Sequence, residues 1–445
     1  MFAQMFKDGE EKVRPGTYTN YKAKASNSIK KTTRGVTMLP FLGYDWGENG
    51  KIYKVTNEAP DEFKTEFGRS VTSDNGFMKM LRLAMKRSNT VYVYVLSGGE
   101  KAKVTAGSLT CTAKYGGTRG NSLKVESEEV IGEGFTVTVY LDNEKVEQFT
   151  GAQTVEDLLN ADSDYIVFSG TETEELTEFA AKPLEGGTDA TNSNDEFVNY
   201  LDSIETINCQ TAVIPVEDES LKEVAVAKAK YLTGEPGKNV QFVIPDCRAN
   251  DPSVISVGNT FSDADGVVDI KQACAWVAGA TAAAEKSESL TYTIVDGATD
   301  VSGSTKHEEI VEQIKKGNFI FSKDQDENVI VEYDINSLTN PAKGQNDSFK
   351  KNKVIRIMQA FAEDLRKNFP PNKFDDNEDG YSLAEGLGRA LLDRYENTEK
   401  VIKNVDYGSD FKVCREESTG DLLVIDYAIQ PVDSKEKIYL RGTIN

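Results

Sequence analysis

Short apolar runs of strand length alternate with amphipathic helical segments along much of this chain, and this alternation restricts its possible folds more than any other feature. Within it, Phe197, Leu201 and Ile204 recur at helical spacing, and a second helix places Leu221, Val224, Ala225 and Lys228 on one stripe. The predicted order is helix 192–205, strand 211–215, helix 217–232, strand 240–245, helix 269–286 and strand 290–295. This pattern is typical of an α/β layer structure with a largely parallel sheet.

Residues 34–97 repeat this pattern and are predicted to belong to the same α/β domain. A strand begins at Arg34, helices are expected at 61–68 and 74–88, and TVYVYVLSG from Thr90 reads as a buried strand. At the other end of the domain, residues 318–335 read as a β-hairpin.

Residues 98–187 differ in character from the segments on either side. Gly98-Gly99 opens this stretch and Gly186-Gly187 closes it, and GFTVTVYLDNEKVEQF alternates apolar and polar residues with a period of two. The stretch holds 17 acidic and 7 basic residues, so it carries −10 of the chain's net charge of −22. We expect a small β-rich domain, inserted into a loop of the α/β domain and protruding into solvent.

The end of the chain is predicted to form a third, α+β unit. Val354, Ile357, Met358, Phe361 and Leu365 share one helical face. A long helix over 382–404 and a last strand after Lys435 follow. The predicted organisation is an N-terminal arm (1–30), the first part of the central α/β domain (31–97), the inserted β-rich domain (98–187), the second part of the central domain (188–339) and a C-terminal α+β domain with a terminal strand (340–445).

Composition argues against several partners. With 51 basic and 73 acidic residues, the chain would repel the phosphates of nucleic acid. No apolar run approaches the roughly 20 residues of a membrane span. The N-terminal sequence MFAQMFKDGEEKVRPG lacks the apolar region of a secretory signal, so synthesis in the cytoplasm is expected.

No catalytic, metal or cofactor site is predicted. His307 is the only histidine and reads as an exposed residue at the start of a helix, and the five cysteines are far apart and expected to be reduced. The acidic loop that begins at Asp375 has Gly386 where a calcium loop needs its bidentate glutamate. The sequence around Gly237-Lys238 lacks the first glycine and the hydroxyl residue of a phosphate loop.

Several stretches, in the correct order along the whole chain, resemble the contractile tail sheath proteins of long-tailed bacteriophages. The resemblance is greatest to those of Gram-positive phages and their bacteriocin-like relatives. The final strand departs from the family's pattern at Gly442. The stretches that carry the resemblance are KVRPGTYTNYKAKASNSI, RGVTMLPFLGYDWG, VYVYVLSGG, KYGGTRGNSLKVESEE, EGGTDATNSNDEFVNYLDSIETINCQTAVIP, NKVIRIMQAFAEDLRKNF, NEDGYSLAEGLGRALLDRY and IQPVDSKEKIYLRGTI.

The resemblance implies a structural protein without enzymatic activity. Such proteins stack six-subunit rings helically around a tail tube, bind baseplate and tail terminator proteins, and contract from a metastable extended state to drive the tube through the bacterial envelope. The implied location is the tail of a virion or of a phage-tail-like particle. The alternative from another class is a carbohydrate-binding or carbohydrate-acting surface protein with a β-domain insert.

Two sets of residues are candidates for assembly contacts. The basic residues Lys350, Lys351, Lys353 and Arg356 are expected to face an acidic tube through weak, salt-sensitive pairs. The second set lies in the two extended terminal arms, which are expected to add strands to a neighbouring subunit, as the resemblance also implies. The arm residues are Thr17, Tyr18, Thr19, Asn20, Tyr21, Ile438, Tyr439, Leu440 and Arg441.

Overall fold

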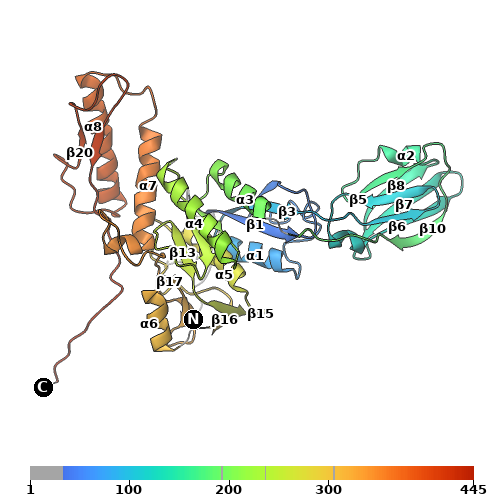
Figure 1. The fold of residues 1–445 in the computed structure, drawn as a ribbon, viewed down its shortest axis with the longest axis horizontal. Coiled ribbons are helices and arrows are strands. Elements are labelled where there is room, and N and C mark those ends of the chain that lie inside the picture. Colours follow the sequence, from blue (N-terminus) through green and yellow to red (C-terminus); the bar gives the residue numbers. More distant parts are fainter. Residues whose placement is uncertain (1–33, 192–193, 236, 304–305, 445) are drawn as a thin grey trace, which may run out of the picture. The chain divides into compact units, whose positions relative to one another are not determined.

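The computed structural model describes residues 34–191, 194–235, 237–303 and 306–444. Within these ranges the largest sheet has seven strands in the order β17-β13-β12-β11-β1-β3-β2 (Figure 1). All neighbouring strands run parallel except β2 and β3, which are antiparallel. The predicted α/β layer structure with a largely parallel sheet is therefore confirmed. The strands are β1 (Val36–Tyr44), β2 (Ile52–Thr56), β3 (Thr90–Ser97), β11 (Thr211–Val213), β12 (Gln241–Pro245), β13 (Val254–Val257) and β17 (Asn318–Phe319).

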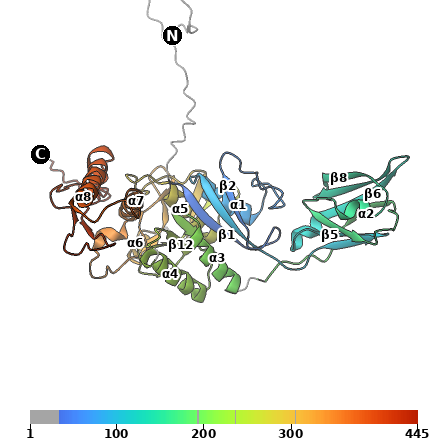
Figure 2. The same ribbon diagram turned by 90° about the horizontal axis from the view of Figure 1, so that it is seen from above.

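Helices cover both faces of this sheet, which is why its strands are continuous apolar runs. Helices α1 (Gly76–Met85) and α5 (Ile270–Ala283) pack on one face, and α3 (Asn194–Thr206) and α4 (Glu219–Gly234) pack on the other (Figure 2). Helices α1 and α5 approach so closely that a Cβ atom on Gly279 would collide with the backbone of Ala84.

Three local expectations for the central domain are wrong. Residues 61–68 form turns that end at Gly68, whose φ is +64°. Residues 290–295 make only an isolated bridge, because Tyr292 has a φ of +63° that interrupts an extended strand. In α4, Val224 is 43% exposed and Lys222 is buried instead, with its ammonium 2.8 Å from the Glu219 carboxylate.

The predicted hairpin is present in part of its range. Strands β18 (Phe321–Lys323) and β19 (Val329–Val331) pair antiparallel, whereas β17 just before them joins the main sheet. Nearby lie the three-stranded sheet β15-β14-β16 and the helix α6 (His307–Lys315), in which His307 is exposed as expected. The bounds of these strands are Thr260–Asp263 for β14, Gly266–Val267 for β15 and Ala298–Ser302 for β16.

The inserted region is a β-sandwich of two antiparallel sheets, β4-β5-β9 and β10-β6-β7-β8. Val137 and Val139 of β7 are fully buried, as the period-two pattern predicts. The two crossings between this region and the central domain lie side by side, since Thr188 N donates to Glu100 O at 3.2 Å. The elements are β4 (Lys103–Ala106), β5 (Leu109–Ala113), η1 (Thr118–Ser122), β6 (Leu123–Val130), β7 (Gly134–Leu141), β8 (Glu144–Ala152), α2 (Glu156–Leu159), β9 (Ile166–Gly170) and β10 (Phe179–Pro183).

The C-terminal region packs two helices around its own core, which includes Ile357, Phe361, Leu392 and Tyr395. The predicted helix 382–404 instead begins at Glu378 and ends with a π-helical turn at Thr398. Lys400, with a φ of +56°, then turns the chain back so that Val401 N donates to Tyr395 O at 2.9 Å. No strand forms after Lys435 in the described part of the chain. The elements are η2 (Asp347–Lys350), α7 (Asn352–Asn368), α8 (Glu378–Asp393), η3 (Arg394–Thr398), β20 (Phe411–Val413) and β21 (Ile425–Tyr427).

Candidate assembly site

The C-terminal segment exposes an unusual series of large apolar side chains. Ile438, Tyr439, Leu440 and Ile444 are 74%, 86%, 90% and 100% exposed. Within the described residues this segment pairs with no strand. Burying each such side chain would contribute roughly 1.5–3 kcal/mol, so the segment has the properties of a strand that lacks its partner.

An unpaired sheet edge lies on the same chain. Strands β20 and β21 form a two-stranded sheet among the described elements. The outer side of β20 faces α8, because Val413 N donates to Glu385 Oε1 at 3.2 Å. The outer side of β21 has no strand beside it in the described structure, and Asp426 and Tyr427 are exposed there. Such an edge can accept a strand from another chain.

A groove adjoins this open edge. Its volume is about 430 Å³, and Tyr427 and Ile429 line one part of it. Helix α7 contributes Ile355, Met358 and Ala362 to its wall. The rest of the lining includes the polar residues Asn239, Asp251 and Ser253. An incoming strand on β21 would therefore find apolar side chains on the α7 wall and polar ones elsewhere in the groove.

Two of the four expected tube-facing residues are buried in this chain. Arg356 is fully buried, donates from Nη1 to Glu288 O at 2.6 Å, and lies 3.5 Å from the carboxylate of Asp334. It is therefore not at the surface, which corrects the expectation for this residue. Lys353 is 8% exposed and donates to Ser434 Oγ at 2.9 Å, and burial lowers the pKa of its ammonium group.

The other two candidates differ in exposure. The Lys351 ammonium lies 4.2 Å from the centre of the Tyr333 ring, pairs with Glu436, and has its pKa lowered by burial. Lys350 ends η2, is about one-third exposed and pairs with Asp347 at 2.8 Å. Of the four side chains, that of Lys350 is the most exposed. Contact between Lys350 and the tube stays a prediction. The other arm candidates, residues 17–21, lie outside the described residues.

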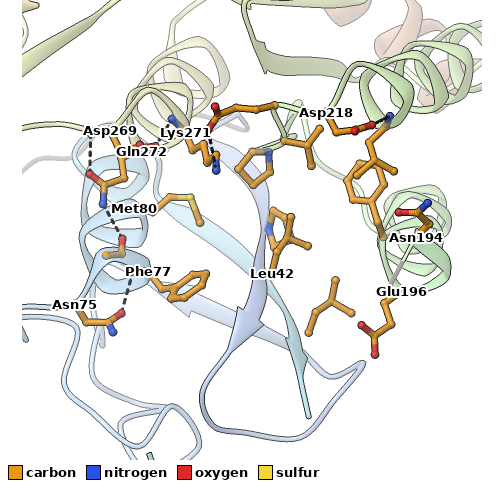
Figure 3. A pocket seen from close by; sticks show the side chains of 18 residues that line it. Leu42, Asn75, Phe77, Met80, Asn194, Glu196, Asp218, Asp269, Lys271 and Gln272 are labelled. Atoms are coloured by element: carbon orange, nitrogen blue, oxygen red, sulfur yellow. Dashed lines mark hydrogen bonds and ion pairs between the residues drawn. The ribbon is translucent and has the colours of Figure 1, made fainter. Parts of the chain in front are cut away.

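A cavity that sequence reasoning missed lies at the carboxyl ends of β1, β3 and β11 (Figure 3). Its volume is about 490 Å³. In α/β folds this place often binds an anionic ligand at helix N-termini. Here the N-termini of α1, α4 and α5 are already capped by the side chains of Asn75, Asp218 and Asp269. Glu196 adds a further lining carboxylate, and the ammonium of Lys271 is already paired with Glu217 at 2.9 Å, so the cavity is unsuited to a phosphate.

The loops tested for ligand binding have structural roles. Asn377 caps α8 by accepting from Gly380 N at 2.8 Å, and Lys238 donates to the α3 carbonyls of Ile204 and Glu205. Among the described residues no group of three His, Cys, Asp or Glu side chains is placed to hold a metal ion. In the same ranges, no helix is both long enough and apolar enough to span a membrane.

Comparison with known proteins identifies the family over most of the chain. Three family models match consecutive segments: the phage tail sheath protein beta-sandwich domain over 97–190, the central domain over 190–337, and the phage tail sheath C-terminal domain over 344–445. The phage-like element PBSX protein XkdK of Bacillus subtilis is 31% identical and covers 99% of both chains.

Solved structures agree with this assignment. The sheath tail protein of Desulfitobacterium hafniense is 33% identical, with a TM-score of 0.83 over 96% of this chain and 99% of that one. The sheath tail protein of Listeria innocua is 30% identical, with a TM-score of 0.75 over 92% and 95% of the two chains. The protein described here therefore belongs to the phage tail sheath family.

Proposed function

We propose that this structural protein polymerises into a contractile sheath around a tail tube. Six-subunit rings stack helically, assemble in a metastable extended state, and convert to a shorter state that drives the tube through the bacterial envelope. The partners are further copies of the chain, the tube protein, and baseplate and terminator proteins. The protein is made in the host cytoplasm and acts in a phage tail or tail-like particle.

One observation carries the proposal: within the described residues, the chain has both an exposed apolar segment and a sheet edge without a partner strand, at different places. Residues 438–444 supply the segment, and β21 with its neighbouring groove supplies the edge. When two subunits do not exchange such a contact reciprocally, it is heterologous and generates a ring or an open helical polymer.

The free energy of one added strand is suited to an assembly whose subunits move relative to one another. Four or five main-chain hydrogen bonds at ~0.5–1.5 kcal/mol each would contribute a few kcal/mol per added strand. Repeated around every ring, these links would keep neighbouring subunits connected while their bodies rotate. The short strand provides the connection without a large rigid interface.

Negative-stain microscopy tests the proposal with two chains, the full protein and a version that ends at Lys437. The full chain is expected to form rings or ribbed cylinders, and the shortened chain to remain monomeric and folded. A third version, in which 438–445 is replaced by Gly and Ser residues of equal number, separates loss of apolar side chains from loss of length. Uniform monomers from the full chain, co-expressed with its tube protein, would contradict the proposal.

Contact with the tube is tested separately through Lys350. Since Lys351, Lys353 and Arg356 make contacts within this chain, reversing their charges would disturb the fold. Lys350→Glu is expected to weaken sheath–tube co-assembly in a salt-dependent manner and to leave the melting temperature unchanged. Equal co-assembly by the wild type and this variant across salt concentrations would remove Lys350 from the tube interface.

A further inference from the structure

Side-chain exposure in the C-terminal segment rises sharply between Glu436 and Ile438. The side chain of Ile438 is exposed, whereas that of Glu436 is only 9% exposed. The Glu436 Oε1 atom accepts hydrogen bonds from Ser289 Oγ at 2.7 Å and from Thr291 Oγ1 at 2.8 Å. Its second carboxylate oxygen pairs with the Lys351 ammonium.

Contacts on either side hold the same stretch of backbone. Val432 N donates to Val401 O at 2.8 Å, and Ser434 Oγ accepts from Lys353 Nζ at 2.9 Å. The Lys437 ammonium lies 5.8 Å from the centre of the Tyr333 ring. Residues 432–437 are thus fixed to the segment that follows α5, to α7 and to the chain after η3, and we call them the C-terminal anchor.

Glu436 is the central contact of this anchor. A carboxylate removed from water is stable only with donors and a compensating cation. Its two hydroxyl donors come from a segment about 145 positions away in the sequence, and its ammonium partner from one about 85 positions away. The carboxylate is therefore held by contacts that exist only in the folded chain. The strand propensity of the C-terminal residues does not explain why Glu436 binds these three partners.

We propose that Glu436 is a positioning residue that fixes where the inter-subunit arm begins, so that only 438–445 is free to reach a neighbour. This inference rests on the proposed function. Eight extended residues at ~3.3 Å each reach about 26 Å. Release of the anchor, residues 432–437, would add about 20 Å at the same rise per residue. The anchor therefore limits the spacing at which two subunits stay linked.

Limited proteolysis of the unassembled subunit tests the anchor, with Lys351→Met as the variant and Lys350→Met as its matched control. Both changes leave the sequence after residue 430 intact. The intrinsic preference of trypsin for each cleavage site in this C-terminal segment is therefore the same in all chains. Loss of 436–445 reports cleavage after Lys435, and loss of 442–445 reports cleavage after Arg441. Intact-mass spectrometry measures both, and thermal melting confirms that each variant is folded.

Wild type and Lys350→Met are expected to be cut quickly after Arg441 and slowly after Lys435. Lys351→Met should be cut after Lys435 about tenfold faster, because cleavage follows the population of the detached segment, with an unchanged rate after Arg441. Equal Lys435 cleavage rates in Lys351→Met and Lys350→Met would overturn the anchor.

Assembly of the same variants tests the positioning role. Lys351→Met should require a higher protein concentration than the wild type to form cylinders, or should form cylinders of irregular spacing. Normal cylinders from a variant whose anchor is released would show that the anchor does not position the arm. Absence of cylinders from the wild type would contradict the proposed function, while the proteolysis result would still decide whether the anchor exists.

Discussion

At the residue scale, the buried pair of Arg356 and Asp334 joins the C-terminal helix α7 to the loop that ends the central domain. The Asp334 carboxylate also accepts from Asn352 Nδ2 at 2.9 Å and from Leu290 N at 3.0 Å. Removing one member of a buried ion pair leaves an uncompensated charge. Arg356→Met is therefore expected to lower the free energy of unfolding by about 3–5 kcal/mol in urea titrations.

A double-mutant cycle distinguishes this pair from simple loss of packing. Arg356→Met combined with Asp334→Asn should lose clearly less than the sum of the two single losses, because no buried charge is then left alone. Strictly additive losses would show that the two side chains do not stabilise each other.

A second residue-scale prediction concerns the half-exposed Cys414. Its thiol donates to Asp426 Oδ2 at 3.0 Å, and this hydrogen bond raises the thiol's pKa above its ordinary value of 9.0. Asp426→Asn should lower the pKa and so increase the thiolate fraction at pH 7.5. Alkylation of Cys414 should be several-fold faster in this variant, and the difference should disappear at a pH where both thiols are ionised. The exposed Asp421→Asn serves as control, and a faster rate there too would exclude a specific effect of Asp426.

At the scale of elements, the close approach of α1 and α5 depends on a glycine. Gly279→Ala would place a methyl group against the Ala84 backbone, and such overpacking costs about 1–3 kcal/mol. Gly386 in α8 is a matched control, since a Cβ atom there meets nothing within 4 Å. Gly386→Ala should stabilise the protein by about 0.5–1 kcal/mol through helix propensity. Thermal melting of both variants should shift in opposite directions, and a loss of similar size in both would show that helix packing is not the cause.

At the scale of the whole molecule, the inserted β-sandwich is predicted to be separable from the central domain. Its two crossings meet at Glu100 and Thr188, which are hydrogen-bonded to each other. Replacing 101–187 by a short Gly-Ser linker should leave a soluble body with helical circular dichroism that still assembles. Trp46 lies 5.3 Å from the ring of Tyr115 in the insert, so its fluorescence should shift to the red. An insoluble or unfolded product would show that the insert is an integral part of the core.

The sequence alone determined the α/β layers, the β-rich insert and the glycine-flanked crossings, because apolar periodicity and backbone freedom are local properties. Its pattern also placed the chain in its family. Only the tertiary structure decided that Lys351, Lys353 and Arg356 turn inward, since their partners Glu436, Ser434 and Asp334 come from other segments. In the described part of the chain, it likewise left residues 438–444 without a partner strand and held residues 432–437 against the folded domains. The three basic side chains turn inward because partners from other segments accept their hydrogen bonds or balance their charge, and a strand forms only beside a second strand. Neither condition can be inferred from the local sequence.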